Sequence, residues 1–297
     1  MKDDSRQRQS AGIRQLSFGI FCLLAASLHA DTLVLKSGLT ATGKSFRRQG
    51  DVILVTVEIP GPDGRPMTAE RSTPLAEILK VECVQPEALK TAPALLAAGK
   101  AASVLPAADA AAKLAEPFGD LPGSYWPALI VLKAHTLLGM GKDAEAAALA
   151  TTMRNSANAD LARDARAVEA VIAARKGDHG TAAALAAPLL KEATRPSTIA
   201  AAAVARGLGY LQQQQFQEAL KAFLELPVFT PDETALSGMA QLGAAQAYYG
   251  MADYDRAIAT LQDLIMTQPG SSETPKAQTL LPEWQRRRTA VNAAKAP

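Results

Sequence analysis

The chain is poor in the residues that most often build metal and disulfide centres. Its 297 residues include two cysteines and three histidines. Cys22 falls within an apolar N-terminal run, so Cys83 has no partner for an internal disulfide once that run is removed. His135 and His179 stand far apart in the sequence, which favours surface or helix-capping roles over metal ligation. We therefore predict no metal site and no cofactor.

Catalytic motifs are also missing. The sequence contains no Gly-x-Ser-x-Gly elbow, no Cys/His pair and no His-Glu-x-x-His. Carboxylate pairs such as Asp160/Asp164 and Asp253/Asp255 lie at expected helix starts and turns, where capping explains them. A hydrolase or transferase acting on envelope polymers would need a clustered acid/base pair, so we predict that the protein is not an enzyme.

The chain also lacks a charge excess and has few aromatic residues. Aromatic side chains make up 5% of the sequence, which suits closely packed helices rich in small residues. Residues 1–30 carry four of the 31 basic and two of the 29 acidic residues, so the remainder holds 27 of each. A neutral chain gives no reason to expect nucleic acid or an anionic membrane as a partner.

Residues 1–30 have the pattern of a secretory signal peptide. A basic start up to Arg14 leads into an uncharged run over Leu16–Leu28, and Ala30 precedes Asp31. The alternative is a retained anchor, but thirteen helical residues span only about 20 Å of a hydrocarbon core of about 30 Å. We therefore expect cleavage, no integral membrane span afterwards, and an exported protein located in the periplasm or otherwise outside the cytoplasm.

Residues 31–85 have the pattern of a small β domain. Short runs rich in β-branched residues are separated by turn signals such as Ser37-Gly38 and Gln49-Gly50-Asp51. One tight turn over Pro74–Glu77 precedes the last run. This pattern resembles an SH3-like or Sm-like barrel and predicts five strands in a closed small barrel. The expected strands are Thr32–Lys36, Thr42–Arg48, Val52–Ile59, Met67–Ser72 and Ile78–Cys83.

One segment of this domain matches a phosphate-binding loop in its letters. Gly38 through Ser45 reads Gly-x-x-x-x-Gly-Lys-Ser, a motif that requires a helix directly after it. The next strand begins at Val52, which leaves no room for that helix. A β-hairpin that bends at Gly38 and Gly43 explains the same residues.

Residues 86–288 are expected to be helical, and the alanine-rich tail 289–297 is expected to fray. Tight turns between amphipathic segments predict antiparallel neighbours. Trp126 and Trp284 bracket the region, either as binding hot spots or as residues that close the core at its ends. The expected helices are Glu87–Ala102, Ala107–Ala115, Trp126–Gly139, Asp143–Thr152, Leu161–Lys176, Thr181–Lys191, Ser197–Gln213, Phe216–Leu226, Glu233–Tyr249 and Tyr254–Thr267.

A set of residue types recurs at an interval of 38 near the C-terminus. Self-similarity at such a period is typical of a solenoid, in which stacked units bury a core that no single unit could bury. Small residues in the set are expected to let the two helices of a unit cross closely. Gly207, Tyr210, Phe216, Ala219, Phe223, Leu226 and Pro231 return as Ala245, Tyr248, Tyr254, Ala257, Leu261, Leu264 and Pro269.

These residues resemble the tetratricopeptide repeat (TPR) family. The small residues Ala146, Ala182, Ala219 and Ala257 step by 36, 37 and 38 positions, slightly more than the family period of 34. The match is closest over 200–270 and looser over 124–196. The resemblance implies an α-solenoid of four to five antiparallel helix pairs after the β domain.

The resemblance also implies that the first helix of each unit lines a concave groove. Amide and aromatic side chains there could bind the backbone of an extended peptide, although the same residues could instead pack against a neighbouring unit. The corresponding residues are Leu208, Leu211, Gln212 and Gln215 in one unit and Leu242, Gln246, Tyr249 and Asp253 in the next.

The function that follows is a scaffold. We expect an exported TPR-like protein that binds another protein or a peptide within a cell-envelope complex. The alternative is a structural protein of the envelope whose solenoid packs on its own copy as a homo-oligomer. An exposed leucine stripe would favour that alternative.

Overall fold

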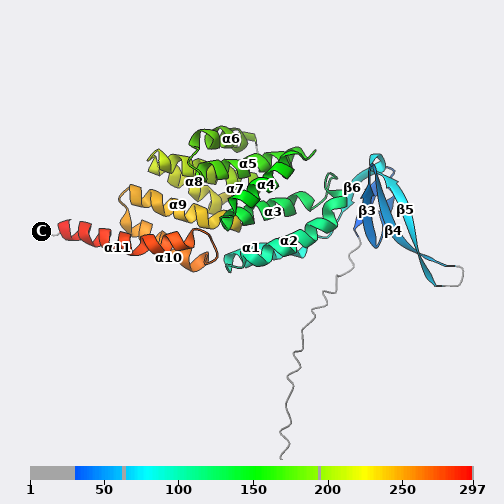
Figure 1. The fold of residues 1–297 in the computed structure, drawn as a ribbon, viewed down its shortest axis with the longest axis horizontal. Helices are drawn as coiled ribbons and strands as arrows, with labels where there is room; N and C mark the ends of the chain where they lie inside the picture. Colours follow the sequence, from blue (N-terminus) through cyan, green and yellow to red (C-terminus); the bar gives the residue numbers. More distant parts are fainter. Residues whose placement is uncertain (1–30, 62–64, 193–194, 296–297) are drawn as a thin grey trace, which may run out of the picture.

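The computed structural model describes residues 31–61, 65–192 and 195–295, in which a small β region precedes a helical array (Figure 1). The predicted signal peptide therefore lies outside the described residues. Among the residues described, no helix combines the length and the apolar character that a membrane span requires.

The β region contains two three-stranded antiparallel sheets and not the closed five-stranded barrel predicted from the sequence, so that prediction was wrong. One sheet has the order β2-β1-β6 and the other the order β3-β4-β5. A short helical turn, Leu75–Glu77, precedes the last strand, as expected. The strands are Thr32–Leu35 (β1), Thr40–Thr42 (β2), Ser45–Gln49 (β3), Val52–Pro60 (β4), Pro66–Pro74 (β5) and Ile78–Glu82 (β6).

The two sheets arise because the strand expected over Thr42–Arg48 is broken at Gly43. A Cβ atom on Gly43 would lie 2.4 Å from Val55 Cγ1 and 2.7 Å from the carbonyl oxygen of Thr56. Only glycine lets the backbone approach β4 this closely. The next residue, Lys44, donates its backbone N–H to the Thr56 carbonyl at 2.8 Å and pairs with Glu58 through its side chain. Strand β3 follows where a phosphate-binding loop would require a helix. The hairpin expected at Gly38 is present, because β1 and β2 pair antiparallel on either side of it, but the hairpin bend expected at Gly43 is wrong, because β2 and β3 belong to different sheets.

Both sheets contribute to one small core. Leu33, Ile53 and Val55 are completely buried there, together with Phe118 from a helical turn that lies well beyond residue 85. The Phe118 ring meets Phe46 edge to face at 5.1 Å between centroids. A segment of the helical region therefore completes the core of the β region.

Helices α1 to α10 agree closely with the sequence prediction, whereas α11 was not among the expected helices. The main difference among these is the boundary between the first two helices. Helix α1 ends near Gly99, which has a φ of +73°, and Pro106 lies inside α2 instead of before it. Helix α11 runs to Lys295, past residue 288, where we expected the ordered helices to end. The helices are Glu87–Ala97 (α1), Ala101–Ala115 (α2), Trp126–Gly139 (α3), Asp143–Arg154 (α4), Ala159–Arg175 (α5), His179–Glu192 (α6), Pro196–Gln212 (α7), Phe216–Phe229 (α8), Ser237–Gly250 (α9), Tyr254–Thr267 (α10) and Thr274–Lys295 (α11).

Four successive helix pairs, α3–α4 to α9–α10, repeat one design. The turn inside each pair contains a residue with positive φ, and these residues step by 36, 37 and 38 positions, as the small residues do. The four small residues are Ala146, Ala182, Ala219 and Ala257, and each is at most 1% exposed. The two helices of each pair therefore cross closely, as predicted. The turn residues are Gly141 (φ 74°), Gly177 (φ 83°), Gln214 (φ 58°) and Ala252 (φ 59°).

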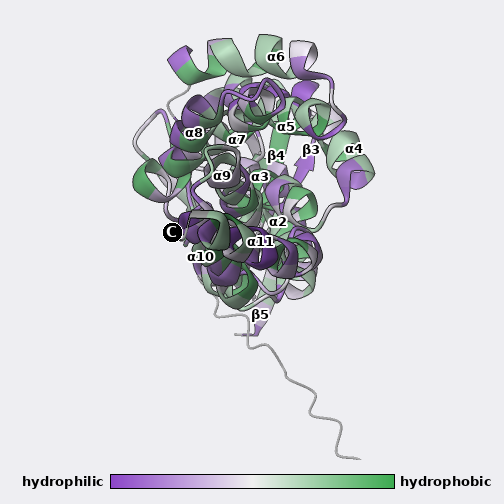
Figure 2. Cartoon of the chain, turned by 90° about the vertical axis from the view of Figure 1, so that its left-hand side faces the viewer, coloured by the Kyte–Doolittle hydropathy of each residue, from purple (hydrophilic) through white to green (hydrophobic). Residues whose placement is uncertain are grey.

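The array is tightly curled. Helices α3, α5, α7 and α9 contact one another in sequence, and α3 also contacts α9. Figure 2 shows α4, α6 and α8 at the periphery, with α3, α7 and α9 nearer the centre. The backbone N–H of Ser272 donates to the Gly139 carbonyl at 2.9 Å, and a Cβ on Gly139 would lie 2.3 Å from the Ala235 carbonyl oxygen. The first and last pairs of the array therefore touch.

The C-terminal end of the array is closed by Trp284 on α11. Its side chain is 4% exposed and stacks on Tyr249 of α9 at 4.4 Å between ring centroids. Of the two roles left open for this tryptophan, the structure supports the core-closing one.

Candidate functional site

A concave cleft of about 530 Å³ lies on the inner side of the array. Helices α7 and α9 form its walls, the end of α5 and the start of α6 close one side, and the start of α11 closes another. We call this site the concave cleft. Its lining residues are Ala174, Arg175, His179, Leu208, Leu211, Gln212, Phe216, Met239, Leu242, Gly243, Gln246, Glu273 and Lys276.

Five of the eight groove residues expected from the sequence line this cleft. Leu208, Leu211 and Gln212 come from the last turns of α7, and Leu242 and Gln246 come from α9. Leu242 is buried in the wall, whereas Gln212 is exposed. The fold therefore places residues of α7 and residues of α9, which are 30 or more positions apart in the chain, at the same cleft. Whether they bind a ligand stays a prediction.

The other three expected residues lie outside the cleft and have structural contacts. Tyr249 stacks on Trp284. Asp253 caps α10, because its carboxylate accepts the backbone N–H of Arg256 at 3.2 Å, and the hydrogen bond from the Arg256 side chain lowers the pKa of that carboxyl group. Gln215 is exposed in the turn before α8.

Arg175, which lines the cleft and joins the segments around it, was not among the residues expected from the sequence. Its guanidinium donates to the Leu138 carbonyl oxygen at 2.9 Å and lies 3.4 Å from Asp143 and 3.6 Å from Glu273. It thereby joins α5 to α3, α4 and the segment before α11. As the last residue of a helix, Arg175 has the local pattern of an ordinary exposed helix end, so only the curled array explains its role.

The cleft combines an apolar wall with a polar rim. Leu208, Leu211 and Met239 supply apolar surface, while the amides of Gln212 and Gln246 can each donate and accept a hydrogen bond. Lys276 is exposed at the edge. This arrangement fits binding of a polar chain with apolar side chains. Among the described residues, no group of histidine, cysteine and acidic side chains could hold a metal ion.

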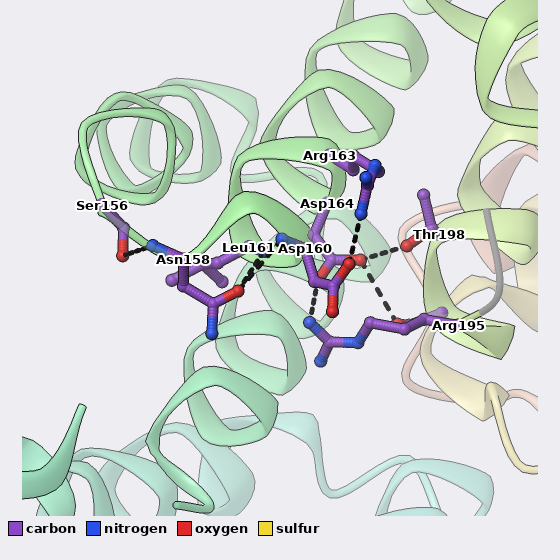
Figure 3. A network of polar contacts seen from close by, with 9 residues as sticks. Ser156, Asn158, Asp160, Leu161, Arg163, Asp164, Arg195 and Thr198 are labelled. Atoms are coloured by element: carbon purple, nitrogen blue, oxygen red, sulfur yellow. Dashed lines mark hydrogen bonds and ion pairs between the residues drawn. The ribbon is translucent and has the colours of Figure 1, made fainter. Parts of the chain in front are cut away.

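A separate polar network ties α5 to the start of α7 (Figure 3). Asp164 of α5 has no exposed surface, lies 2.5 Å from the Arg195 guanidinium and accepts a hydrogen bond from the Thr198 hydroxyl. Burial raises the pKa of Asp164, and Arg195 and then Thr198 oppose that rise. Nearby, Asn158 caps α5 by accepting the backbone N–H of Asp160 at 3.0 Å. The capping role expected for the Asp160/Asp164 pair is therefore wrong for Asp164. This residue lies beyond the first turn of α5, and its side chain is buried against the start of α7.

His135 also differs from its expected surface or capping role. Its side chain is 1% exposed, and its Nδ1 lies 3.1 Å from Glu233 in the segment before α9. The two residues are 98 positions apart and meet only because the array curls.

Comparison with known proteins adds little to this description. No protein-family model matches the chain, and no curated protein matches it. A crystal structure of a tetratricopeptide repeat protein from Parabacteroides merdae is similar to it at 20% identity and a TM-score of 0.35, over 70% of this chain and 75% of that chain. The repeated turns and buried alanines of this chain define a helical-repeat protein with TPR-like pairs.

Proposed function

We propose that the protein is an exported scaffold that binds a protein or peptide segment in the concave cleft, as part of a cell-envelope complex. The observation that carries the proposal is that five residues expected to line a groove border one cleft of about 530 Å³. This volume lies within the range of about 300–1,000 Å³ typical of ligand sites. Export rests on the basic, apolar and small-residue pattern through Ala30.

The occupant that this cleft suits is an extended peptide. Leu208 and Leu211 offer apolar contact along one wall, and Gln246 on the facing helix can satisfy the N–H and C=O groups of a peptide backbone. A rigid helical wall lowers the entropy cost of binding, because the lining side chains are already held on packed helices.

Site-specific photocrosslinking in the native cell envelope tests this proposal. We expect a benzophenone side chain at Gln212, in the cleft, to form a covalent adduct with one partner. The same side chain at Gln217, which is exposed on α8 outside the cleft, should form none. The purified partner should then bind the Leu211→Glu variant about tenfold or more weakly than the wild type, because a charge is placed on the apolar wall.

Two results would count against the proposal. Equal adducts at both positions would place the partner elsewhere on the surface. Unchanged affinity of Leu211→Glu, with an unchanged melting temperature, would remove the cleft from the interface.

Self-assembly remains the second candidate, and one observation favours it. Leu224, Val228 and Phe229 on the outer helix α8 are 42%, 65% and 70% exposed, and Met266 on α10 is 76% exposed. Apolar side chains gathered on an outer helix are typical of a protein contact. The molecular mass in solution separates the candidates, since self-assembly requires at least a dimer.

A further inference from the structure

Strand β5 is an open edge of the sheet β3-β4-β5. Its nine residues, Pro66–Pro74, pair with β4 without a register shift, and Figure 1 shows β5 on the side of the β region that faces away from the helices. Among the described residues, no second strand pairs with β5. Proteins commonly protect such an edge with a bulge, a short strand or an internal proline. The prolines of β5 stand only at its two ends, so the edge can accept a further strand.

The inner face of the β4–β5 hairpin continues beyond the small core as an apolar row. Val55 of β4 is completely buried in that core, and every second residue along β4 lies on the same face. Further along the hairpin, Val57 faces Ala69 and Ile59 faces Met67. Ile59 is 45% exposed and Met67 is 49% exposed. A strand added to β5 would extend this row and cover part of its exposed surface.

The charges on β5 favour one register for pairing with a second copy of the same strand. Every second residue of an edge strand points its N–H and C=O groups outwards, so two copies of one edge pair antiparallel only with odd residues facing odd and even facing even. A pairing centred on Glu70 or on Arg71 would put that residue opposite its own copy, and like charges directly opposite each other are unfavourable. A pairing centred on Ala69 instead puts Glu70 opposite Thr68. It also puts Arg71 opposite Met67, so no like charges face each other.

We propose that two copies of the protein pair antiparallel through β5, centred on Ala69, and form one sheet of six strands, three from each copy. In this register the overlap covers seven residues, 66–72, whereas centring on Thr68 or on Ser72 leaves an overlap of five. The contact lies in the β region, so it leaves the concave cleft open and does not involve α8.

Side chains on both faces of the joined sheet support this register. On the inner face, the two Ala69 residues join the apolar rows of the two copies. The aliphatic stem of each Arg71 packs on Met67 of the other copy. On the outer face, each Thr68 hydroxyl can donate a hydrogen bond to a Glu70 carboxylate of the other copy. The edge of β5 is therefore complementary to itself in shape and charge.

Sedimentation velocity of the purified protein tests the proposal. We expect the wild type to dimerise with a dissociation constant of about 10 µM, because a single strand edge makes a small interface. Thr68→Glu should weaken the dimer about tenfold or more, since it places a carboxylate opposite Glu70 at both ends of the contact. The double variant Thr68→Glu/Glu70→Lys should restore the dimer, because opposite charges then face each other. A wild type that stays monomeric at about 100 µM, or a double variant without rescue, would overturn the proposal.

Disulfide trapping tests the register. Ala69→Cys places two thiols opposite each other and should give a covalent dimer on mild oxidation. Ser72→Cys lies on the same edge, but its two thiols would be six positions apart along the strands, about 20 Å, so it should give no more covalent dimer than the wild type with Cys83 alone. Equal yields from the two variants would overturn the register.

Val228→Asp distinguishes this dimer from assembly through α8. Val228 is 65% exposed on α8, so the substitution places a charge within that apolar surface. The β5 dimer should keep its dissociation constant in this variant. A dimer that is lost in Val228→Asp and kept in Thr68→Glu would place the contact on α8 and overturn the proposal.

Discussion

Replacing Phe223 by alanine is expected to lower the free energy of unfolding by about 4 kcal/mol. The Phe223 ring is 1% exposed and fills a slot between Gly207 of α7 and Gly243 of α9. A Cβ atom on either glycine would lie 2.7 Å or 2.3 Å from that ring, so the slot exists only because both side chains are absent. Alanine leaves a cavity at the junction of two successive pairs, where solenoid stability resides. Denaturant unfolding followed by circular dichroism measures the change.

Phe229 provides the matched control on the same helix. Its ring is 70% exposed, so Phe229→Ala should change the unfolding free energy by less than about 0.5 kcal/mol. Similar effects of the two substitutions would show that Phe223 does not hold α7 and α9 together as described.

The repeat explains how much of this packing could be predicted. Phe223 and Gly207 both belong to the set that recurs after 38 residues, so the sequence marked each as a packing position, and their mutual contact comes from the structure. The limits of most helices also followed to within a few residues, because turns such as Gly141 and Gly177 break the helical pattern. Gly243 lies outside the recurring set, and its role emerges only from the contact with Phe223.

Local pattern failed where a distant segment decides the structure. The break at Gly43 depends on Val55 and Thr56 of the neighbouring strand, and a hairpin pattern cannot distinguish a kinked strand from a straight one. Pro106 reads as a helix breaker, yet α2 accommodates it at an exposed position while Gly99 sets the boundary. His135 reads as a surface residue because its partner is 98 positions away.

The residues of the candidate site also fall into two groups, those that could be expected from the sequence and those that could not. Leu208, Leu211 and Gln246 were expected beside a groove because the TPR resemblance places the first helix of each unit there, and all three line the cleft. Arg175 could not, because its contacts with Leu138, Asp143 and Glu273 require the array to curl back on itself. Curvature is a sum of small rotations between units, and no single repeat encodes it.

The buried network around Asp164 also depends on contacts between distant segments. Substitution within this network is expected to have the second large effect on the free energy of unfolding. Taking a carboxylate out of water is unfavourable, as the raised pKa of Asp164 indicates, so the ion pair with Arg195 adds little net stability over an apolar replacement of both partners. Removing one partner alone is a different change. It leaves the other group without the charge or hydrogen bond that its burial requires.

Asp164→Ala is therefore expected to lower the free energy of unfolding by about 3 kcal/mol. The value lies at the low end for a broken buried pair because Arg195 is 26% exposed and can partly hydrate, while the Thr198 hydroxyl loses its acceptor. Asp160→Ala is the control on the same helix: its side chain is 51% exposed beside Arg163, and the change should stay below about 1 kcal/mol. Asp164→Asn, which keeps an acceptor for Thr198 but loses the charge, should fall between the two. Equal unfolding free energies for Asp164→Ala and Asp160→Ala would show that the network does not hold α5 against the start of α7.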